Sequence, residues 1–286
     1  MSLWSWWVAH LMKSKARGWK LFLKTVIARA YPRVIAQQRE KSWIFFDVFL
    51  PMLAVSAYVF IYRAIGAPED YVGFVVLGGA MTAFWLNVLW SMSTQFYWEK
   101  ETGNLSLFIM APAPKMAILL GMALGGMVAT SLRAGTIIIV GSFLFRVRYS
   151  VFNPPLLAVV FILTLVALYG LGMMNASLFL LWGREAWHLA SLAQEPIYLL
   201  SGFYFPIKSL GFWVAVLASL IPLTLGLDAM RQLLFPSGSA LGFLNVYLEV
   251  AGLAVLSVIF LAAARFLLNY MERKAISEGR LLEIQR

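Results

Sequence analysis

The sequence holds few of the side chains that enzymes use for covalent or metal chemistry. It contains no cysteine and only two histidines, His10 and His188, which lie far apart along its 286 residues. Disulfides, thiolate nucleophiles and cysteine-bound metals are therefore excluded, and two distant histidines do not predict a metal site. No Gly-x-x-x-x-Gly-Lys-Ser/Thr loop, Gly-x-Ser-x-Gly turn or His-Glu-x-x-His motif occurs. We expect no catalytic residue and no cofactor in this chain, so any ATP that drives it must bind a separate subunit.

A short charged stretch at residues 99–101, Glu-Lys-Glu, stands between two long apolar runs. Gly103 follows it and permits a sharp change of direction, while Pro112 stops a helix that begins near Leu105. A short helix held between a charged turn and a proline turn, at the end of a membrane span, is suited to press on a partner outside the membrane. The alternative interpretation is a merely solvated turn.

Four ionisable residues lie within or near the apolar runs: Asp47, Arg133, Glu195 and Glu249. A charged side chain at the centre of a bilayer costs about 2.5–3.5 kcal/mol on insertion scales, so such residues usually face a helix bundle or a cavity. Arg133 and Glu195 lie furthest from the ends of their runs and are candidates for a transport path. Ion pairing inside the bundle is the alternative, and the sequence does not identify the carboxylate that partners Arg133.

Asn87, Ser91 and Gln95 form a polar stripe, because a spacing of four residues places them on one face of a helix. Hydrogen bonding to neighbouring helices is the more general interpretation of such a stripe. Lining of a substrate path is the other.

The elements that position these residues are membrane helices. The chain is 62% hydrophobic and only 13% charged, whereas an average soluble chain is nearer half apolar and a quarter charged. Its net charge of +10 does not predict nucleic-acid binding, because the basic residues gather outside the apolar runs. Most of them fall on the side of the two termini, so the positive-inside rule predicts cytoplasmic amino and carboxyl termini.

We predict an all-α integral membrane protein with six transmembrane helices. An apolar run of about 20 residues can cross a hydrocarbon core of about 30 Å. The predicted spans cover residues 43–62, 71–97, 116–145, 155–181, 189–205 and 241–268, and together with the loops they make up a transmembrane domain at 43–268.

The regions that flank this domain are basic or charged. Residues 1–42 alternate aromatic and basic side chains at three- and four-residue spacing, which predicts an amphipathic helix at the membrane surface. This helix is expected to anchor the chain to the bilayer, or also to contact a cytoplasmic partner. Residues 269–286 form a charged cytoplasmic tail. Within the third span, Gly121 and Gly125 continue a spacing of small residues that predicts close helix contact.

Residues 211–235 predict a re-entrant pair of helices before the last span. The first apolar part has too few residues before Pro222 to cross a membrane alone. The second part carries Asp228 and Arg231, a pair spaced for an interfacial helix. Two short helices that dip into the outer leaflet and return fit this pattern better than one crossing.

Two stretches of the sequence resemble the ABC-2 type transporter permeases, the membrane halves of a large group of ATP-driven exporters. The first follows the order Glu-x-Gly-x-Leu-x-Leu-x-x-x-x-Pro of a cytoplasmic loop in that family, with Glu101, Gly103, Leu105, Leu107 and Pro112. The second matches the family's re-entrant turn through Ser201, Gly202, Pro206, Pro222, Asp228 and Arg231. One departure is Leu210-Gly211, where the family often has a proline before the tryptophan.

The resemblance implies an exporter of a hydrophobic or amphipathic small molecule, drug or lipid-like substrate, located in the cytoplasmic membrane. Two permease subunits, identical or different, would pair with two ABC ATP-binding subunits that hold ATP and Mg²⁺. The helix at 99–114 would dock on the ATPase. In this hypothesis Glu99, Glu101 and Gly103 shape the turn, Leu105 and Leu107 dock, and Pro112 ends the helix.

A membrane-embedded transferase enzyme is the alternative function. Such an enzyme needs a histidine–carboxylate or carboxylate cluster at one membrane face. The acidic residues do not cluster in that way along the sequence, although His188 lies close to Glu185.

Overall fold

The computed structural model describes residues 18–39, 41–103, 113–182 and 185–277, and these residues form helices and connecting turns. The element bounds, in chain order, are α2 Trp19–Arg39, α3 Lys41–Ala64, α4 Asp70–Leu86, the π-helix η1 Asn87–Met92, α5 Gln95–Glu101, α7 Lys115–Phe145, α8 Pro154–Trp182, α9 Glu185–Leu200, the 3₁₀ helix η2 Ile207–Leu210, α10 Phe212–Ala218, α11 Pro222–Leu234, α12 Gly238–Leu241 and α13 Val246–Ser277. The prediction of an all-α membrane protein is confirmed.

Five helical stretches are long and apolar enough to cross a membrane: Phe45–Ala64, Asp70–Glu99, Lys115–Phe145, Pro154–Ser177 and Val246–Tyr270. They correspond to five of the six predicted spans. The number rises to six if the bent pair α10–α11 is counted as one span.

The predicted span at 189–205 corresponds to α9, which starts earlier, at Glu185, and ends at Leu200. Its 16 residues reach about 24 Å at about 1.5 Å per residue, which is less than a hydrocarbon core of about 30 Å. The chain then turns at Gly202, whose φ of +62° is a conformation that glycine adopts readily.

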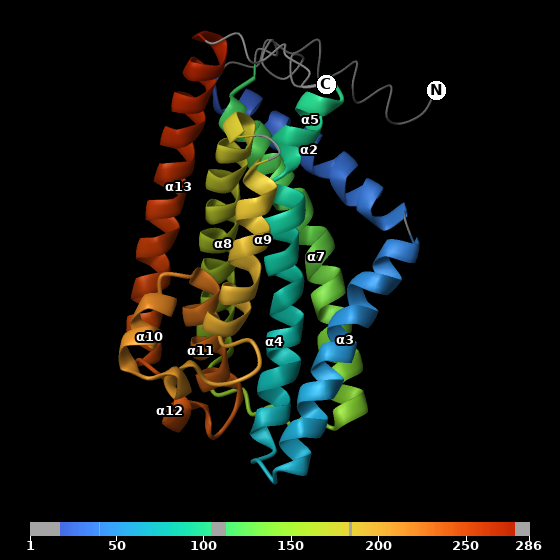
Figure 1. Cartoon of the computed structure of the whole chain (residues 1–286), viewed down its shortest axis with the longest axis vertical. Coiled ribbons are helices and arrows are strands. Elements are labelled where there is room, and N and C mark those ends of the chain that lie inside the picture. Colours follow the sequence, from blue (N-terminus) through green and yellow to red (C-terminus); the bar gives the residue numbers. More distant parts are fainter. Residues whose placement is uncertain (1–17, 40, 104–112, 183–184, 278–286) are drawn as a thin grey trace.

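α10 and α11 meet at an angle of 111°, as two helices of a re-entrant pair would. Pro222 occupies the first turn of α11, where its missing N–H is not needed. Figure 1 shows α10, α11 and α12 gathered at one end of the bundle, here called the α10 end, where α9 leads into the pair and α13 leaves it. The opposite end holds α2 and α5 and is called the α5 end.

The continuous helical segment α4–η1–α5 is the centre of the bundle. α4 is buried over nearly its whole length and packs against α3, α7 and α11. α4 packs especially closely against the turn that follows α9. An added Cβ on Gly78 would lie 1.5 Å from the carbonyl oxygen of Phe203 in this turn. This central segment ends in the charged stretch at 99–101.

α2 lies across α7 in direct backbone contact. An added Cβ on Gly121 would lie 2.6 Å from the carbonyl oxygen of Val26, and one on Gly125 would lie 2.8 Å from that of Ala30. The small residues of α7 therefore allow the close helix contact that the sequence predicts, and the partner is the amphipathic helix.

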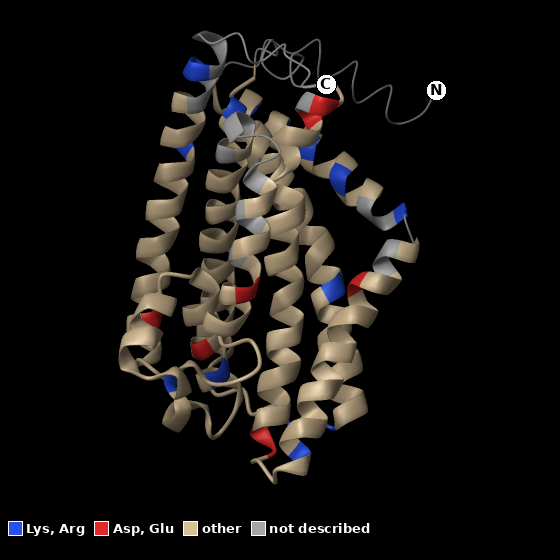
Figure 2. Ribbon diagram, viewed as in Figure 1, with Lys and Arg blue, Asp and Glu red and all other residues tan. Residues whose placement is uncertain are grey.

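Charge is gathered at the two ends of the bundle and on α2, and little lies along the middle of the helices (Figure 2). This distribution is typical of a protein with an apolar band that faces lipid.

Candidate functional site

The polar stripe of the second span lies on η1 and on the first residue of α5. Asn87 begins the π-helix, and its side-chain oxygen accepts a hydrogen bond of 2.9 Å from the Tyr169 hydroxyl of α8. The wider π turn is closed by the bond from the Ser93 N–H to the Val88 carbonyl, 3.0 Å. Short π segments inside α-helices are frequent at functional sites.

Arg33 of α2 binds the other two residues of the stripe. Its Nη2 donates to the Ser91 hydroxyl at 2.7 Å, and its Nη1 donates to the Gln95 side-chain oxygen. Burial lowers the pKa of Arg33 to about 10, which is still far above neutral pH, so the guanidinium stays charged. For Ser91 and Gln95 these bonds favour the interpretation that the stripe binds a neighbouring helix.

A second link joins α2 to α5. Arg29 forms an ion pair with Glu99, and the Gln95 amide donates to the same carboxylate oxygen at 3.0 Å. Glu99 is buried and points toward α2. The sequence assigns Glu99, Glu101 and Gly103 to the turn before the ATPase-docking helix, here called the coupling turn. The Glu99 carboxylate of this turn therefore also binds the amphipathic helix α2.

The rest of the predicted coupling helix is described only at its start. Glu101 is half-buried at the end of α5, and Gly103 has a φ of +74°, as the predicted sharp turn requires. Leu105, Leu107 and Pro112 lie outside the described residues.

Arg133 of α7 forms an ion pair with Asp47 of α3. The two residues are 86 positions apart in the sequence, and the structure identifies the partner that the sequence left open. Of the two side chains, Asp47 is 36% exposed and Arg133 is 15% exposed, so the pair lies at a surface of the bundle.

A cavity of about 600 Å³, here called the polar cavity, lies beside this ion pair. Its walls come from α2, α3, α4, η1 and α7. It is lined by Ala36, Phe46, Asp47, Leu50, Pro51, Ala83, Leu86, Asn87, Trp90, Ser91 and Arg133. A volume of this size falls within the usual range for small-molecule sites, about 300–1,000 Å³.

The polar cavity brings together three of the five residues proposed for a transport path: Asn87, Ser91 and Arg133. Gln95 does not line it. Glu195 lies elsewhere, exposed on α9, where the neighbouring Gln194 amide is 3.4 Å from its carboxylate. Gln194 in turn accepts a 2.8 Å hydrogen bond from the Trp90 indole, so α9 contacts η1.

The residues of the re-entrant turn are packed around one buried guanidinium. Arg231 donates to the carbonyl oxygens of Phe203 at 2.8 Å, Phe205 at 3.0 Å and Phe74 at 3.2 Å. Ser201 and Gly202 are buried beside this turn, and Pro206 precedes the short helix η2. Arg231 therefore joins the turn before α10 to α4.

α11, which the sequence predicts as an interfacial helix, is buried within the protein along its length. Arg231 is 2% exposed and Asp228 is 3% exposed. Arg231 binds the three carbonyl oxygens given above. Asp228 accepts a hydrogen bond of 2.8 Å from the backbone N–H of Phe243. α11 is thus part of the bundle interior, whereas α10 is largely exposed.

Sequence reasoning missed Gln232, which lies between two buried carboxylates. Its amide nitrogen is 3.2 Å from an Asp228 oxygen, 3.2 Å from a Glu249 oxygen and 2.8 Å from the Leu244 carbonyl. The signal available in the sequence was the acidic Glu249 near the start of the last span. Its link to Asp228 requires the folded arrangement of α11 and α13.

Comparison with known protein families identifies the family of this chain. The profile described as ABC-2 type transporter matches residues 23–235, which include α3 to α11 and most of α2. A search of individual curated proteins found no significant match.

Proposed function

Since the chain belongs to the ABC-2 type transporter family, we propose that it is the permease of an ATP-driven exporter whose ATP and Mg²⁺ are held by a separate ABC subunit. The chain itself is a multi-pass membrane protein with the transport domain of this family. The membrane-embedded transferase is not retained, because the family is a transport component.

One observation carries the proposal: the polar cavity and the coupling turn are built on one continuous helical segment. Asn87 and Ser91 line the cavity from η1, and Glu99 and Glu101 lie on α5, which follows it directly. A push on the coupling turn would therefore reach the cavity wall through about 15 Å of helix, at about 1.5 Å per residue. A rigid helix transmits such a push, whereas a flexible loop would absorb it.

α2 supports this route. It is bonded to α5 through Arg29 and to η1 through Arg33, and it also forms part of the cavity wall at Ala36. Any displacement of α5 toward or away from the bundle would therefore carry α2 with it. The π segment between α4 and α5 forms the part of the cavity wall that such a displacement reaches first.

The assembly we propose contains two permease subunits, identical or different, and two ATP-binding subunits. The α5 end would face the cytoplasm, in agreement with the basic side chains on α2. The substrate would be a hydrophobic or amphipathic molecule, moved outward across the cytoplasmic membrane.

Co-purification tests the proposal. The tagged, detergent-solubilised protein is isolated from its own host and probed for an ABC ATPase, for the wild type and for Leu105→Asp. Trp213→Asp is the matched control, because Trp213 is 78% exposed on α10, at the end away from α5. We expect the ATPase with the wild type and the control but not with Leu105→Asp. Absence of an ATPase from all three preparations would overturn the proposal.

A further inference from the structure

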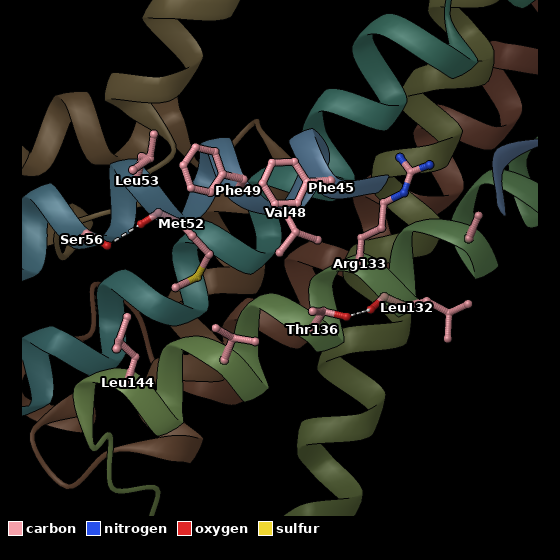
Figure 3. Close-up of a pocket in the computed structure, with 12 residues that line it drawn as sticks. Phe45, Val48, Phe49, Met52, Leu53, Ser56, Leu132, Arg133, Thr136 and Leu144 are labelled. Carbon is pink, nitrogen blue, oxygen red and sulfur yellow. Dashed lines mark hydrogen bonds between the residues drawn. The ribbon is translucent and has the colours of Figure 1, made fainter. Parts of the chain in front are cut away.

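A second cavity, of about 710 Å³, meets the polar cavity at Arg133. We call it the apolar groove. Among the residues that the structure describes, its lining comes from α3 and α7. Its large exposed side chains are Phe45, Phe49, Leu53, Leu132, Val140 and Leu144. Figure 3 shows Phe45, Phe49 and Leu53 on α3 and Leu132 and Leu144 on α7. The groove is therefore open to the lipid side of the bundle.

The walls of the groove offer almost no polar group to a ligand. The Ser56 hydroxyl donates to the Met52 carbonyl at 2.7 Å, and the Thr136 hydroxyl donates to the Leu132 carbonyl at 2.9 Å. Both hydroxyl protons are thus used within their own helices. An alkyl chain would find an apolar surface along the whole groove up to Arg133.

Arg133 provides a charged group at one end of the apolar groove. Its aliphatic stem lines the groove, while Figure 3 shows its guanidinium pointing away from the apolar wall. There it pairs with Asp47, which lines the polar cavity. Arg133 uses Nη1 for this pair, and Asp47 is its one hydrogen-bond partner among the described residues. Further N–H donors of the guanidinium remain for a ligand.

We propose that the apolar groove and the Arg133–Asp47 pair form one binding site for a zwitterionic amphipath taken from the bilayer, with its alkyl tail in the groove and its head group in the polar cavity. The proposal names the substrate class of the permease. It rests on the proposed function only where it calls the ligand a substrate.

Charge complementarity selects the head group. A head group with only an anion would be attracted by Arg133 but repelled by Asp47, and one with only a cation would meet the opposite arrangement. At the edge of a low-dielectric region neither repulsion is well screened. A head group with one anion and one cation, such as phosphate and ammonium, can satisfy both side chains at once.

Photolabelling of the purified permease tests the site without any ATPase. The protein is placed in nanodiscs of phosphatidylglycerol that contain a trace of phosphatidylethanolamine with a photoreactive acyl chain. A phosphatidylglycerol probe with the same reactive chain is used in parallel. We expect the phosphatidylethanolamine probe to label peptides of α3 and α7 about tenfold more than the phosphatidylglycerol probe.

Two variants distinguish the contribution of the lipid head group to binding from that of the acyl tail. Asp47→Asn combined with Arg133→Gln removes both charges while it keeps both side chains polar, and is expected to abolish the preference between the probes. Val140→Trp fills the groove without touching the ion pair and is expected to abolish the labelling itself. Ile139→Trp, at a neighbouring position of α7 that is 70% exposed and outside the groove, should label as the wild type does.

Equal labelling by the two probes in the wild type would overturn the proposal, and so would labelling that survives Val140→Trp. Stronger labelling by phosphatidylglycerol would show that Arg133 acts alone and would overturn the zwitterionic class. Dimers of the permease cross-linked through α3 and α7, in place of lipid adducts, would show a subunit interface instead. Because no ATPase is present, each of these failures leaves the co-purification result untouched.

Discussion

Arg29 of α2 and Glu99 of α5 form an ion pair across 70 residues of sequence, and this pair joins the amphipathic surface helix to the end of the central helix. Arg33, one helical turn further along α2, binds Ser91 and Gln95 in the same way. α2 is thus fixed to the segment that runs from the polar cavity to the coupling turn.

Replacement of Arg33 by alanine should destabilise the protein. The change removes a buried guanidinium and leaves the Ser91 and Gln95 side chains without their donor, which costs about 2 kcal/mol. The melting temperature in detergent, followed by tryptophan fluorescence, should fall by about 5 °C. Lys20→Ala, at an exposed position of α2, is the control and should melt as the wild type does. An unchanged melting temperature for Arg33→Ala would contradict the assigned network.

Leucine at Gly121 should separate α2 from α7. An added Cβ would already lie 2.6 Å from the Val26 carbonyl oxygen, and a larger side chain cannot be accommodated while the helices touch. We expect rapid trypsin cleavage within α2, which is rich in lysine and arginine. Gly135→Leu is the matched control on the same helix, because a Cβ there meets no atom within 4 Å. Equal cleavage of the two variants would speak against the α2–α7 contact.

Lysine at position 231 should not replace arginine. The arginine holds three carbonyl oxygens through a planar fork, whereas a lysine ammonium is a compact group on a flexible stem. Loss of this buried network should cost about 3 kcal/mol and lower the yield of monodisperse protein in size-exclusion chromatography. Lys208→Arg, an exposed change near the same turn, should leave the yield unchanged. Wild-type yield and melting temperature for Arg231→Lys would refute this assignment.

The polar cavity should be accessible to small reagents. Because the chain has no cysteine, a single introduced thiol can be labelled without background. Ala83→Cys, which lines the cavity, is expected to react with a methanethiosulfonate, whereas Ala80→Cys, fully buried on the same helix, should be protected. Reaction at neither position would show that the cavity does not open to solvent, and equal reaction at both would show that access is not confined to the cavity.

The sequence predicts the helices of this protein well because their signals are local. Apolar runs of sufficient length mark the five long spans, and Pro222 between two short apolar segments marks the bend of α10 and α11. Gly121 and Gly125 indicate a close contact but not its partner, which depends on where α2 lies. Likewise Arg133 indicates a buried charge, while Asp47 is identified only by the packing of α3 on α7.

The burial of α11 could not be predicted from the sequence, for a physical reason. Asp228 and Arg231 are charged, and a charged pair on a short helix usually faces the membrane interface. Here the partners of Arg231 are backbone carbonyls at Phe74, Phe203 and Phe205, far from it in sequence. No local pattern reports such partners, since every residue type carries the same carbonyl group.

The central claim is that ATP binding to a partner subunit moves the wall of the polar cavity through the segment α4–η1–α5. Spin labels at Leu50→Cys on α3 and Leu86→Cys on α4, both lining the cavity, report the width of the cavity by double electron–electron resonance in the complex with the ATPase. A pair at Val258→Cys and Phe266→Cys, both exposed on the single helix α13, is the control. We predict that ATP shifts the distance across the cavity and leaves the control distance unchanged. An unchanged cavity distance in a complex that hydrolyses ATP would contradict the account.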